Sequence, residues 1–307
     1  MPWQHAGSIL RPLLWPSVVL AALVFAKICL EPLGPDAAMI ASGLFSAALI
    51  YVLELAVPFA KEWNEDDGEV KTDATFVVVL AAVDDVTRSV ITFACSRWLY
   101  GDSALNLGSS ALKDWWLTQH MAIKVTTALV VGELGGWFSH WLLHVRSLPF
   151  WRLHRVHHAV TRLWILNTYR FHPLDLAMQL VCIHPLLHLV GLNDEMVLFW
   201  YTVWFNVVGQ LSHCNINTKC GVLNFLFNTP EVHRYHHSRE RPVSNSNYGQ
   251  VLIVWDLVFG TFHFNFGGKG TAKGPPVTIG DKFLSGSGVW RNLKLPLQEI
   301  MRCRRRG

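Results

Sequence analysis

The sequence has few charged residues for its length. Asp, Glu, Lys and Arg make up only 16% of its 307 residues, against roughly 25% in ordinary soluble domains. Apolar residues reach 51%, and the 14 Trp and 17 Phe match the aromatic enrichment found at membrane–water interfaces. Such a composition excludes a disordered chain, a collagen and a coiled coil. It indicates a membrane protein with several spans.

Two further features are missing, and each excludes a class of partner or motif. No stripe of Lys and Arg runs through the body of the chain, and the formal net charge is only +4, so we expect no nucleic-acid partner. None of the six cysteines lies in a C-x-x-C pair, which excludes a zinc knuckle and a thioredoxin-type motif. We expect these cysteines to be reduced thiols without a catalytic role.

Apolar segments that are long enough to enter a membrane recur along the chain. Five of them are clear candidates: residues 13–30, 37–57, 121–143, 176–192 and 196–212. Two shorter apolar runs, 74–83 and 90–99, are separated by Asp84, Asp85 and Arg88. Because ionisable groups are costly in hydrocarbon, we expect two half-spans or an interfacial helix there.

Basic residues gather in two places and predict the orientation. Arginines follow the 121–143 segment at positions 146, 152, 155, 162 and 170, and residues 302–306 form a basic run. Since Lys and Arg near the ends of spans favour the cytoplasmic side, we expect both regions to face the cytoplasm. The tail also holds a short stretch over residues 290–300 with the pattern of an amphipathic helix.

Histidines carry the most specific signal in this sequence. Twelve of the fifteen lie between His140 and His237. They include one H-x-x-x-H motif at positions 140–144 and two H-x-x-H-H motifs at 154–158 and 233–237. Residues three and four apart share one face of a helix, so each motif brings its imidazoles together. Eight imidazoles exceed the ligands of one zinc site, which makes two metal ions the economical count, and neutral imidazole suits zinc, copper, iron and nickel.

The pattern matches neither the Glu-x-x-His pairs of soluble di-iron bundles nor the H-E-x-x-H of zinc proteases. Instead, residues 133–261 resemble the sterol desaturase and fatty acid hydroxylase superfamily of membrane di-iron enzymes. Besides the histidine motifs, the matching segments are R-F-H-P at 170–173, S-H-C-N at 212–215, T-P-E-V at 229–232, N-Y-G at 247–249 and W-D-L-V-F-G-T at 255–261. The chain departs from the family at Trp141, which follows His140 where arginine is frequent.

The resemblance implies that ten histidines surround the metals. Eight come from the three motifs and are implied as iron ligands: His140, His144, His154, His157, His158, His233, His236 and His237. His213 is implied as a ninth ligand, and His172 as a further ligand or a neighbour of the ligands. No catalytic residue is implied beyond these ligands.

Four polar side chains are implied to support the ligands. Glu133, Asp175 and Asp256 could orient imidazoles by accepting their second N–H, as ligating histidines usually require. Ion pairs with nearby arginines are the alternative for these acids. Asn247, together with Tyr248, is expected to form a turn that supports the last motif.

The resemblance also implies the fold and the reaction. The fold is an all-α bundle of about four membrane helices, with a cytoplasmic helical layer that holds two iron ions. The chain divides into N-terminal membrane segments (1–120), a catalytic domain (121–262) and a C-terminal tail (263–307). The implied reaction hydroxylates or desaturates a C–H bond of a sterol, fatty acyl chain or related lipid. It uses dioxygen and electrons from a separate cytochrome b5- or ferredoxin-like donor.

The sequence leaves two alternatives to an oxygen-dependent enzyme. A zinc-dependent membrane hydrolase would use the same imidazoles without redox chemistry. A non-enzymatic metal transporter or sensor would bind metal without turning over a substrate. A requirement for dioxygen and a reductant distinguishes the hydroxylase or desaturase from both.

Overall fold

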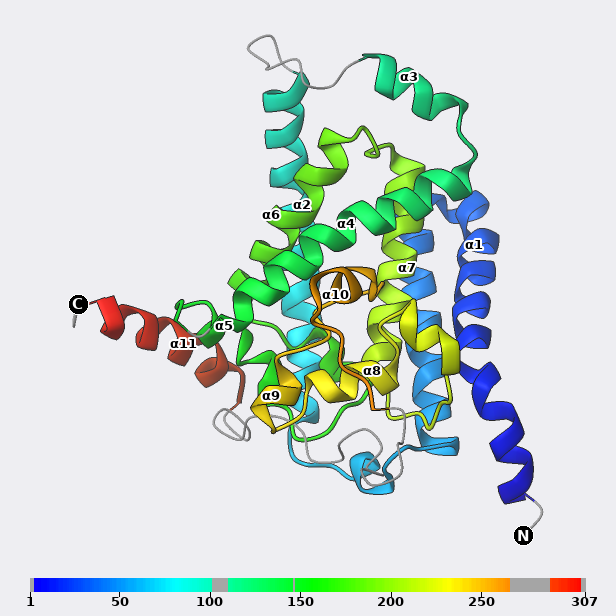
Figure 1. Cartoon of the computed structure of the whole chain (residues 1–307), viewed down its shortest axis with the longest axis vertical. Helices are drawn as coiled ribbons and strands as arrows, with labels where there is room; N and C mark the ends of the chain where they lie inside the picture. The colour runs from blue at the N-terminus through cyan, green and yellow to red at the C-terminus, as the bar shows by residue number, and fades with distance from the viewer. Residues whose placement is uncertain (1–2, 101–109, 146, 266–287, 305–307) are drawn as a thin grey trace.

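The chain folds almost entirely into helices, as Figure 1 shows. The computed structural model describes residues 3–100, 110–145, 147–265 and 288–304. Its long helices are α1 (Trp3–Ala56), α2 (Val70–Tyr100), α4 (Met121–His144), α6 (Pro173–Leu189), α7 (Glu195–His213) and α11 (Gly288–Arg304). In the described ranges, extended pairing is limited to two isolated bridges, Pro58 with Ile216 and Phe227 with Leu252. The all-α prediction is therefore confirmed.

Short helices join and follow the long ones. They are η1 (Lys61–Asn64), α3 (Ser110–Thr118), α5 (Trp151–His154), η2 (His157–Ala159), η3 (Ile165–Tyr169), η4 (Gly221–Phe225), α8 (Pro230–His236), α9 (Arg241–Ser244) and α10 (Val254–Phe259). In Figure 1, α5, α8, α9 and α10 gather in the lower half of the molecule, near the end of α4. This gathering brings together the segments that carry the histidine motifs.

Helix α1 consists of two arms that fold back on each other at Gly34. The backbone of Gly34 has a φ of 75°, which glycine adopts without the steric cost that a Cβ atom brings. Across the fold, Ser42 donates a hydrogen bond to the carbonyl of Ala22 at 3.1 Å, and the rings of Phe25 and Phe45 stack at 4.3 Å. The two arms therefore run antiparallel and in contact.

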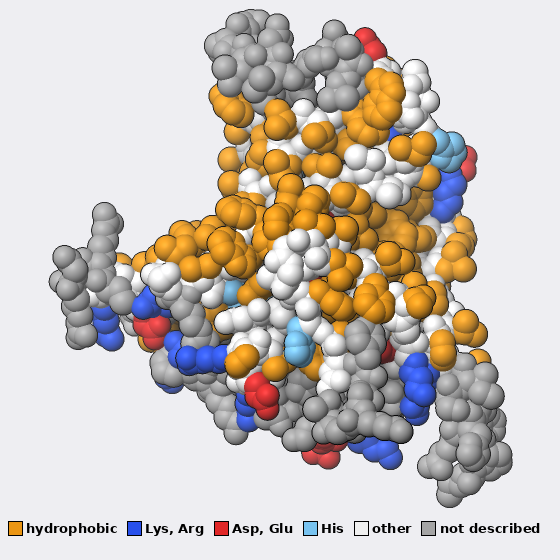
Figure 2. Space-filling view, in the orientation of Figure 1, with side chains coloured by type: hydrophobic (Ala, Val, Ile, Leu, Met, Phe, Trp, Pro, Cys, Tyr) orange, Lys and Arg blue, Asp and Glu red, His pale blue; other side chains and the backbone are white. Residues whose placement is uncertain are grey.

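All five predicted apolar segments lie in helices. The two arms of α1 contain segments 13–30 and 37–57, and α4, α6 and α7 contain most or all of the other three. By length and composition, two helices in the described ranges are able to cross a membrane: Leu10–Ala56, which includes the fold at Gly34, and Met121–His144. Figure 2 shows hydrophobic side chains over the middle and upper part of one face, with many of the charged ones below.

Helix α2 corrects one expectation. Residues 74–83 and 90–99 belong to a single continuous helix of 31 residues, so of the two expected alternatives, half-spans and an interfacial helix, the half-spans are excluded. Arg88 pairs with Asp84 one turn earlier, at 2.6 Å, and its guanidinium also lies 2.9 Å from Nε2 of His184 on α6. Because these charges are partnered along and between helices, they interrupt the hydropathy of the segment without ending the helix.

Helices α4 and α6 approach each other so closely that only glycine fits between them. A Cβ atom added to Gly135 of α4 would lie 2.2 Å from the carbonyl oxygen of Cys182 on α6. The obstacle is backbone and cannot rotate away, so a side chain there would force the two helices apart. This contact fixes the part of α4 that lies just before His140.

We expect Gly135→Ala to lower the free energy of unfolding by about 1–3 kcal/mol, the usual cost of overpacking a tight contact. Thermal unfolding of the purified protein in detergent micelles measures the effect. Gly209→Ala on α7 is the matched control, because a Cβ atom there meets nothing within 4 Å. Equal unfolding temperatures for the two variants would contradict the close approach of α4 and α6.

Candidate metal centre

Separate parts of the chain deliver the nine histidines of the centre. His140 and His144 lie in the last turns of α4, and His213 is the last residue of α7. The second motif starts at the end of α5 and continues into η2, and the third motif occupies α8 and the residue that caps it. All nine side chains are buried, the most exposed of them only 5%.

The nine imidazoles form two groups. The first group contains His140, His144, His154, His158 and His236, and the second contains His157, His213, His233 and His237. Within each group the ligand atoms lie within 4.8 Å of one another. Each H-x-x-H-H motif serves both groups, because its first and last histidines enter one group and its middle histidine enters the other. The outer histidines enter the first group in the motif at 154–158 and the second group in the motif at 233–237. Each motif therefore connects the two groups.

Hydrogen bonds fix where the protons of the first group lie. Nδ1 of His140 lies 2.8 Å from the carbonyl oxygen of Tyr248, and Nδ1 of His236 lies 2.7 Å from that of Ser246. A carbonyl oxygen only accepts hydrogen bonds, so Nδ1 carries the proton in both rings. In the neutral imidazole the other nitrogen, Nε2, is then left with an unprotonated lone pair.

His154 follows the same rule through a carboxylate. Its Nδ1 lies 2.8 Å from Oδ2 of Asp175, and both side chains are fully buried. Its Nε2 faces Nε2 of His140 at 3.0 Å, so in the neutral form of both rings two lone pairs point at each other. A cation removes this repulsion, and two nitrogens bound to one ion at about 2.1 Å and at right angles would be about 3.0 Å apart. The first group therefore fits a metal ion.

The inner nitrogens of the second group lie equally close together. Nε2 of His213 lies 3.0 Å from that of His233, and Nε2 of His237 lies 3.1 Å from those of His157 and His233. Nδ1 of His213 lies 3.1 Å from the amide oxygen of Asn167, which again directs a lone pair at Nε2 into the group. These four nitrogens fit a second ion.

Burial also sets the charge of these rings. It lowers the pKa of five histidines well below the usual value, because desolvation disfavours the imidazolium form and the neighbouring imidazoles add to the effect; they are His157, His158, His233, His236 and His237. The rings are therefore neutral near pH 7. Neutral imidazole is the form that binds a metal.

Two of the expected supporting acids act through the backbone instead of on an imidazole. Both oxygens of Glu133 accept from amides of residues 250–252, including Val251 at 2.8 Å. Asp256 accepts from the amides of Tyr248 at 2.8 Å and Gly249 at 2.7 Å. The expectation that these acids orient imidazoles directly is wrong, because the loop lies between them and the ligands. The same loop presents the Tyr248 carbonyl to His140.

His172 lies outside both groups. Its Nδ1 accepts a hydrogen bond from the amide of Leu174 at 3.2 Å, and its Nε2 lies 3.1 Å from the carbonyl of Leu293 on α11. Nε2 must donate to that carbonyl, so both nitrogens are engaged and neither offers a lone pair to a metal. We therefore leave His172 out of the candidate ligand set.

Asn247 lies in an irregular segment between the third motif and the end of the site. Its φ of 55° is on the left-handed side, which asparagine tolerates better than most residues. Its side-chain amide nitrogen donates to the carbonyl of Val232 in α8 at 3.1 Å and to that of His263 at 2.8 Å. Asn247 thereby ties the third motif to the segment that closes the site.

Several supporting groups have no sequence signal. The amide oxygens of Asn167 and Asn245 lie 3.1 and 3.3 Å from Nδ1 of His213 and His144. The carbonyl of Ser246 plays the same part for His236. Backbone carbonyls are present at every residue, and asparagine is common in loops, so only their positions in space reveal these partners.

Comparison with known proteins identifies the family of the chain. A model of the fatty acid hydroxylase family matches residues 125–261. The chain is 32% identical over 255 residues to the ornithine lipid hydroxylase OlsE of Rhizobium tropici, a match that covers 82% of this chain and 75% of the relative. The chain belongs to the fatty acid hydroxylase family.

More distant relatives match smaller parts of the chain. The alkylglycerol monooxygenase of Homo sapiens is 29% identical over 131 residues, 42% of this chain and 28% of the relative. That of Xenopus tropicalis is 26% identical over 224 residues, 70% of this chain and 45% of the relative. No solved structure is significantly similar to the chain.

We expect Asp175→Asn to weaken metal binding at the first group by about 10–100-fold, because an amide is a poorer acceptor for the His154 N–H than a carboxylate. The measurement is metal content per chain after dialysis of the full-length protein against a graded chelator series. Asp114→Asn, at an exposed position on α3, is the matched control. If both variants hold metal equally well, the contact between Asp175 and His154 does not support the site.

Proposed function

We propose that this protein is a membrane-bound di-iron hydroxylase that acts on a lipid with dioxygen. The observation that carries the proposal is the pair of buried imidazole groups, of five and four histidines, in a chain of the fatty acid hydroxylase family. The relatives are named a lipid hydroxylase and alkylglycerol monooxygenases. These names favour hydroxylation over desaturation.

Two iron ions, one at each group, would supply the activation of dioxygen and the removal of hydrogen from an unactivated C–H bond. The chain itself would hold the ions, exclude water and position the lipid. Insertion of one oxygen atom and reduction of the other to water consumes two electrons and two protons. We assign their delivery to a separate donor of the cytochrome b5 or ferredoxin type.

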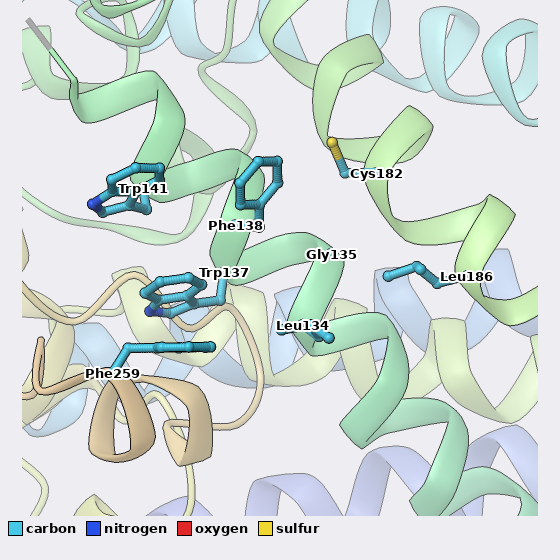
Figure 3. Close-up of a pocket in the computed structure, with 8 residues that line it drawn as sticks. All are labelled: Leu134, Gly135, Trp137, Phe138, Trp141, Cys182, Leu186 and Phe259. Carbon is cyan, nitrogen blue, oxygen red and sulfur yellow. The ribbon is translucent and has the colours of Figure 1, made fainter.

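An apolar groove beside the first group offers a place for the lipid. Figure 3 shows Trp137, Phe138 and Trp141 of α4 on one side of it and Cys182 and Leu186 of α6 on the other. The groove has a volume of about 600 Å³. We propose that a hydrocarbon part of the substrate lies there.

The groove is linked to the candidate ligands by its own wall. Trp137 and Trp141 flank His140 along α4. The indole N–H of Trp137 reaches the Asp256 carboxylate at 3.3 Å, and Asp256 also holds the backbone of Tyr248, whose carbonyl lies beside Nδ1 of His140. A lipid chain in the groove is therefore held by the same elements that orient the first group.

We place the protein across a membrane with its histidine motifs at the cytoplasmic side. The apolar α1 and α4 support membrane spans, and we assign α2, α6 and α7 to the same multi-pass bundle. The arginines that follow α4 favour the cytoplasm for the motifs. This orientation would place the centre within reach of a cytoplasmic electron donor.

The decisive experiment supplies isotopically labelled dioxygen to iron-loaded protein in native lipid extract with a reductant. We expect a lipid that is one oxygen atom heavier and carries the label, and no product from His237→Ala. His120→Ala, an exposed position before α4, is the control and should retain activity. A product two hydrogens lighter without label would indicate a desaturase. Turnover without dioxygen, or by zinc-loaded protein, would indicate the hydrolase alternative.

We expect Leu186→Trp to fill the groove and to lower turnover of the native lipid by about 10-fold or more, because small misplacements of a reacting bond have effects of this order. Lipid mass spectrometry of cells that express each variant measures it. Leu189→Trp, also on α6 but outside the groove and 43% exposed, is the matched control. Equal product from both variants would exclude the groove as the lipid site.

A further inference from the structure

Helix α11 crosses the direction of the long helices. In Figure 1 it lies beside α5 and runs outward at a large angle to α2 and α7. It lies near the level at which α4 ends, where charged side chains begin to replace the hydrophobic ones in Figure 2. A helix at this level and in this direction lies roughly along the surface of a membrane that α2 and α7 cross.

One face of α11 packs on the histidine centre. Leu293, Val289 and Leu295 contact a small cluster that includes Val156 and Ala159. These two cluster residues stand directly before and after the adjacent histidines of the second motif. The Leu293 carbonyl also accepts from His172, so the chain at the start of α6 is tied to the same helix.

A second face of α11 is apolar and has no cover within the described structure. Trp290 is 74% exposed, Met301 is 58% exposed and Leu297 is 37% exposed. Their spacing of seven and four residues places them in one stripe along the helix. Large apolar side chains that share an exposed stripe mark a surface that contacts another apolar medium.

Basic side chains line the edge of this stripe. Arg291, Lys294 and Arg302 are all exposed, and the Lys294 ammonium lies 5.7 Å from the ring centre of Trp290. An apolar stripe with aromatic and basic neighbours is the pattern of a helix that lies in a membrane interface. The basic side chains then meet anionic lipid phosphates, which attract them by roughly 1 kcal/mol each.

We propose that α11 is an interfacial helix that docks on anionic phospholipid at the membrane surface. The proposal rests on the membrane location assigned above. The apolar stripe enters the boundary between headgroups and acyl chains, and the opposite face clamps the second histidine motif. Through α11, contact with the lipid surface sets the position of the histidine centre relative to the bilayer.

Photolabelling of the full chain in nanodiscs tests this inference. The nanodiscs contain phosphatidylcholine with or without phosphatidylglycerol, and a phosphatidylcholine that carries a diazirine near the glycerol backbone. We expect labelled peptides from residues 288–304, with more label when phosphatidylglycerol is present. Trp290→Glu with Met301→Glu should abolish this label. Replacing Arg291, Lys294 and Arg302 singly by Gln should reduce the phosphatidylglycerol-dependent part by about five-fold for each charge.

Two internal references make the result decisive. Label on α4 reports that the protein is inserted, and label on the acidic loop 61–67 gives the background. Label on α11 no higher than on that loop would overturn the proposal. So would weaker binding of an acidic electron-donor protein to the charge variants without any lipid label, because the face would then belong to a protein partner. Labelling needs neither iron nor turnover, so its failure is distinguishable from failure of the proposed hydroxylase activity.

Discussion

The structure depends on one electrostatic constraint: nine buried imidazoles direct their nitrogen atoms into two small volumes. In the first group, acceptors on the outer side hold the proton at Nδ1 of His140, His154 and His236. In the neutral rings the inner nitrogens of His140 and His154 are then lone pairs that repel one another at 3.0 Å. Without a cation such an arrangement is costly in a medium of low dielectric constant. With a cation, the same arrangement becomes a strong binding site.

Much of the surrounding fold serves to present those outer acceptors. Carbonyls that accept from the rings belong to the loop around residues 246–248, and this loop has no regular secondary structure to fix it. Glu133 and Asp256 replace that missing framework by binding its backbone amides. A buried carboxylate that accepts several N–H groups has its own cost of burial offset. The acids thus stabilise the centre one step away from the ligands.

The histidine centre also lies next to the apolar groove. Helix α4 carries both kinds of surface, since its last turns hold His140 while Trp137, Phe138 and Trp141 line the groove in Figure 3. Gly135 lets α6 approach α4 closely, and α6 forms the other side of the groove. In the proposed reaction, one helix therefore positions the oxidising centre and the hydrocarbon together, which reduces the freedom lost when the lipid binds.

The sequence by itself determined the apolar segments that form helices and the eight histidines of the three motifs, and the family resemblance added the all-α class and His213. The sequence could do so because hydrophobic periodicity and short motif spacing are local properties of the chain. Two expectations could not be settled by local patterns in the sequence. The charges at Asp84 and Arg88 were read as a break because their partner on α6 is distant in sequence. Whether His172 is a ligand or a neighbour of the ligands stays open in the sequence, because a motif does not show that both nitrogens are already engaged.

Only the tertiary structure decided how the ligands divide between two groups. The histidines at i and i+4 of each H-x-x-H-H motif join one group and the histidine at i+3 joins the other, although all three lie on roughly one side of the local helix. That division depends on which motif faces which across the core, as do the roles of Asn167, Ser246 and the acids. Such relations arise from packing between segments that can be more than a hundred residues apart, and no local pattern encodes them.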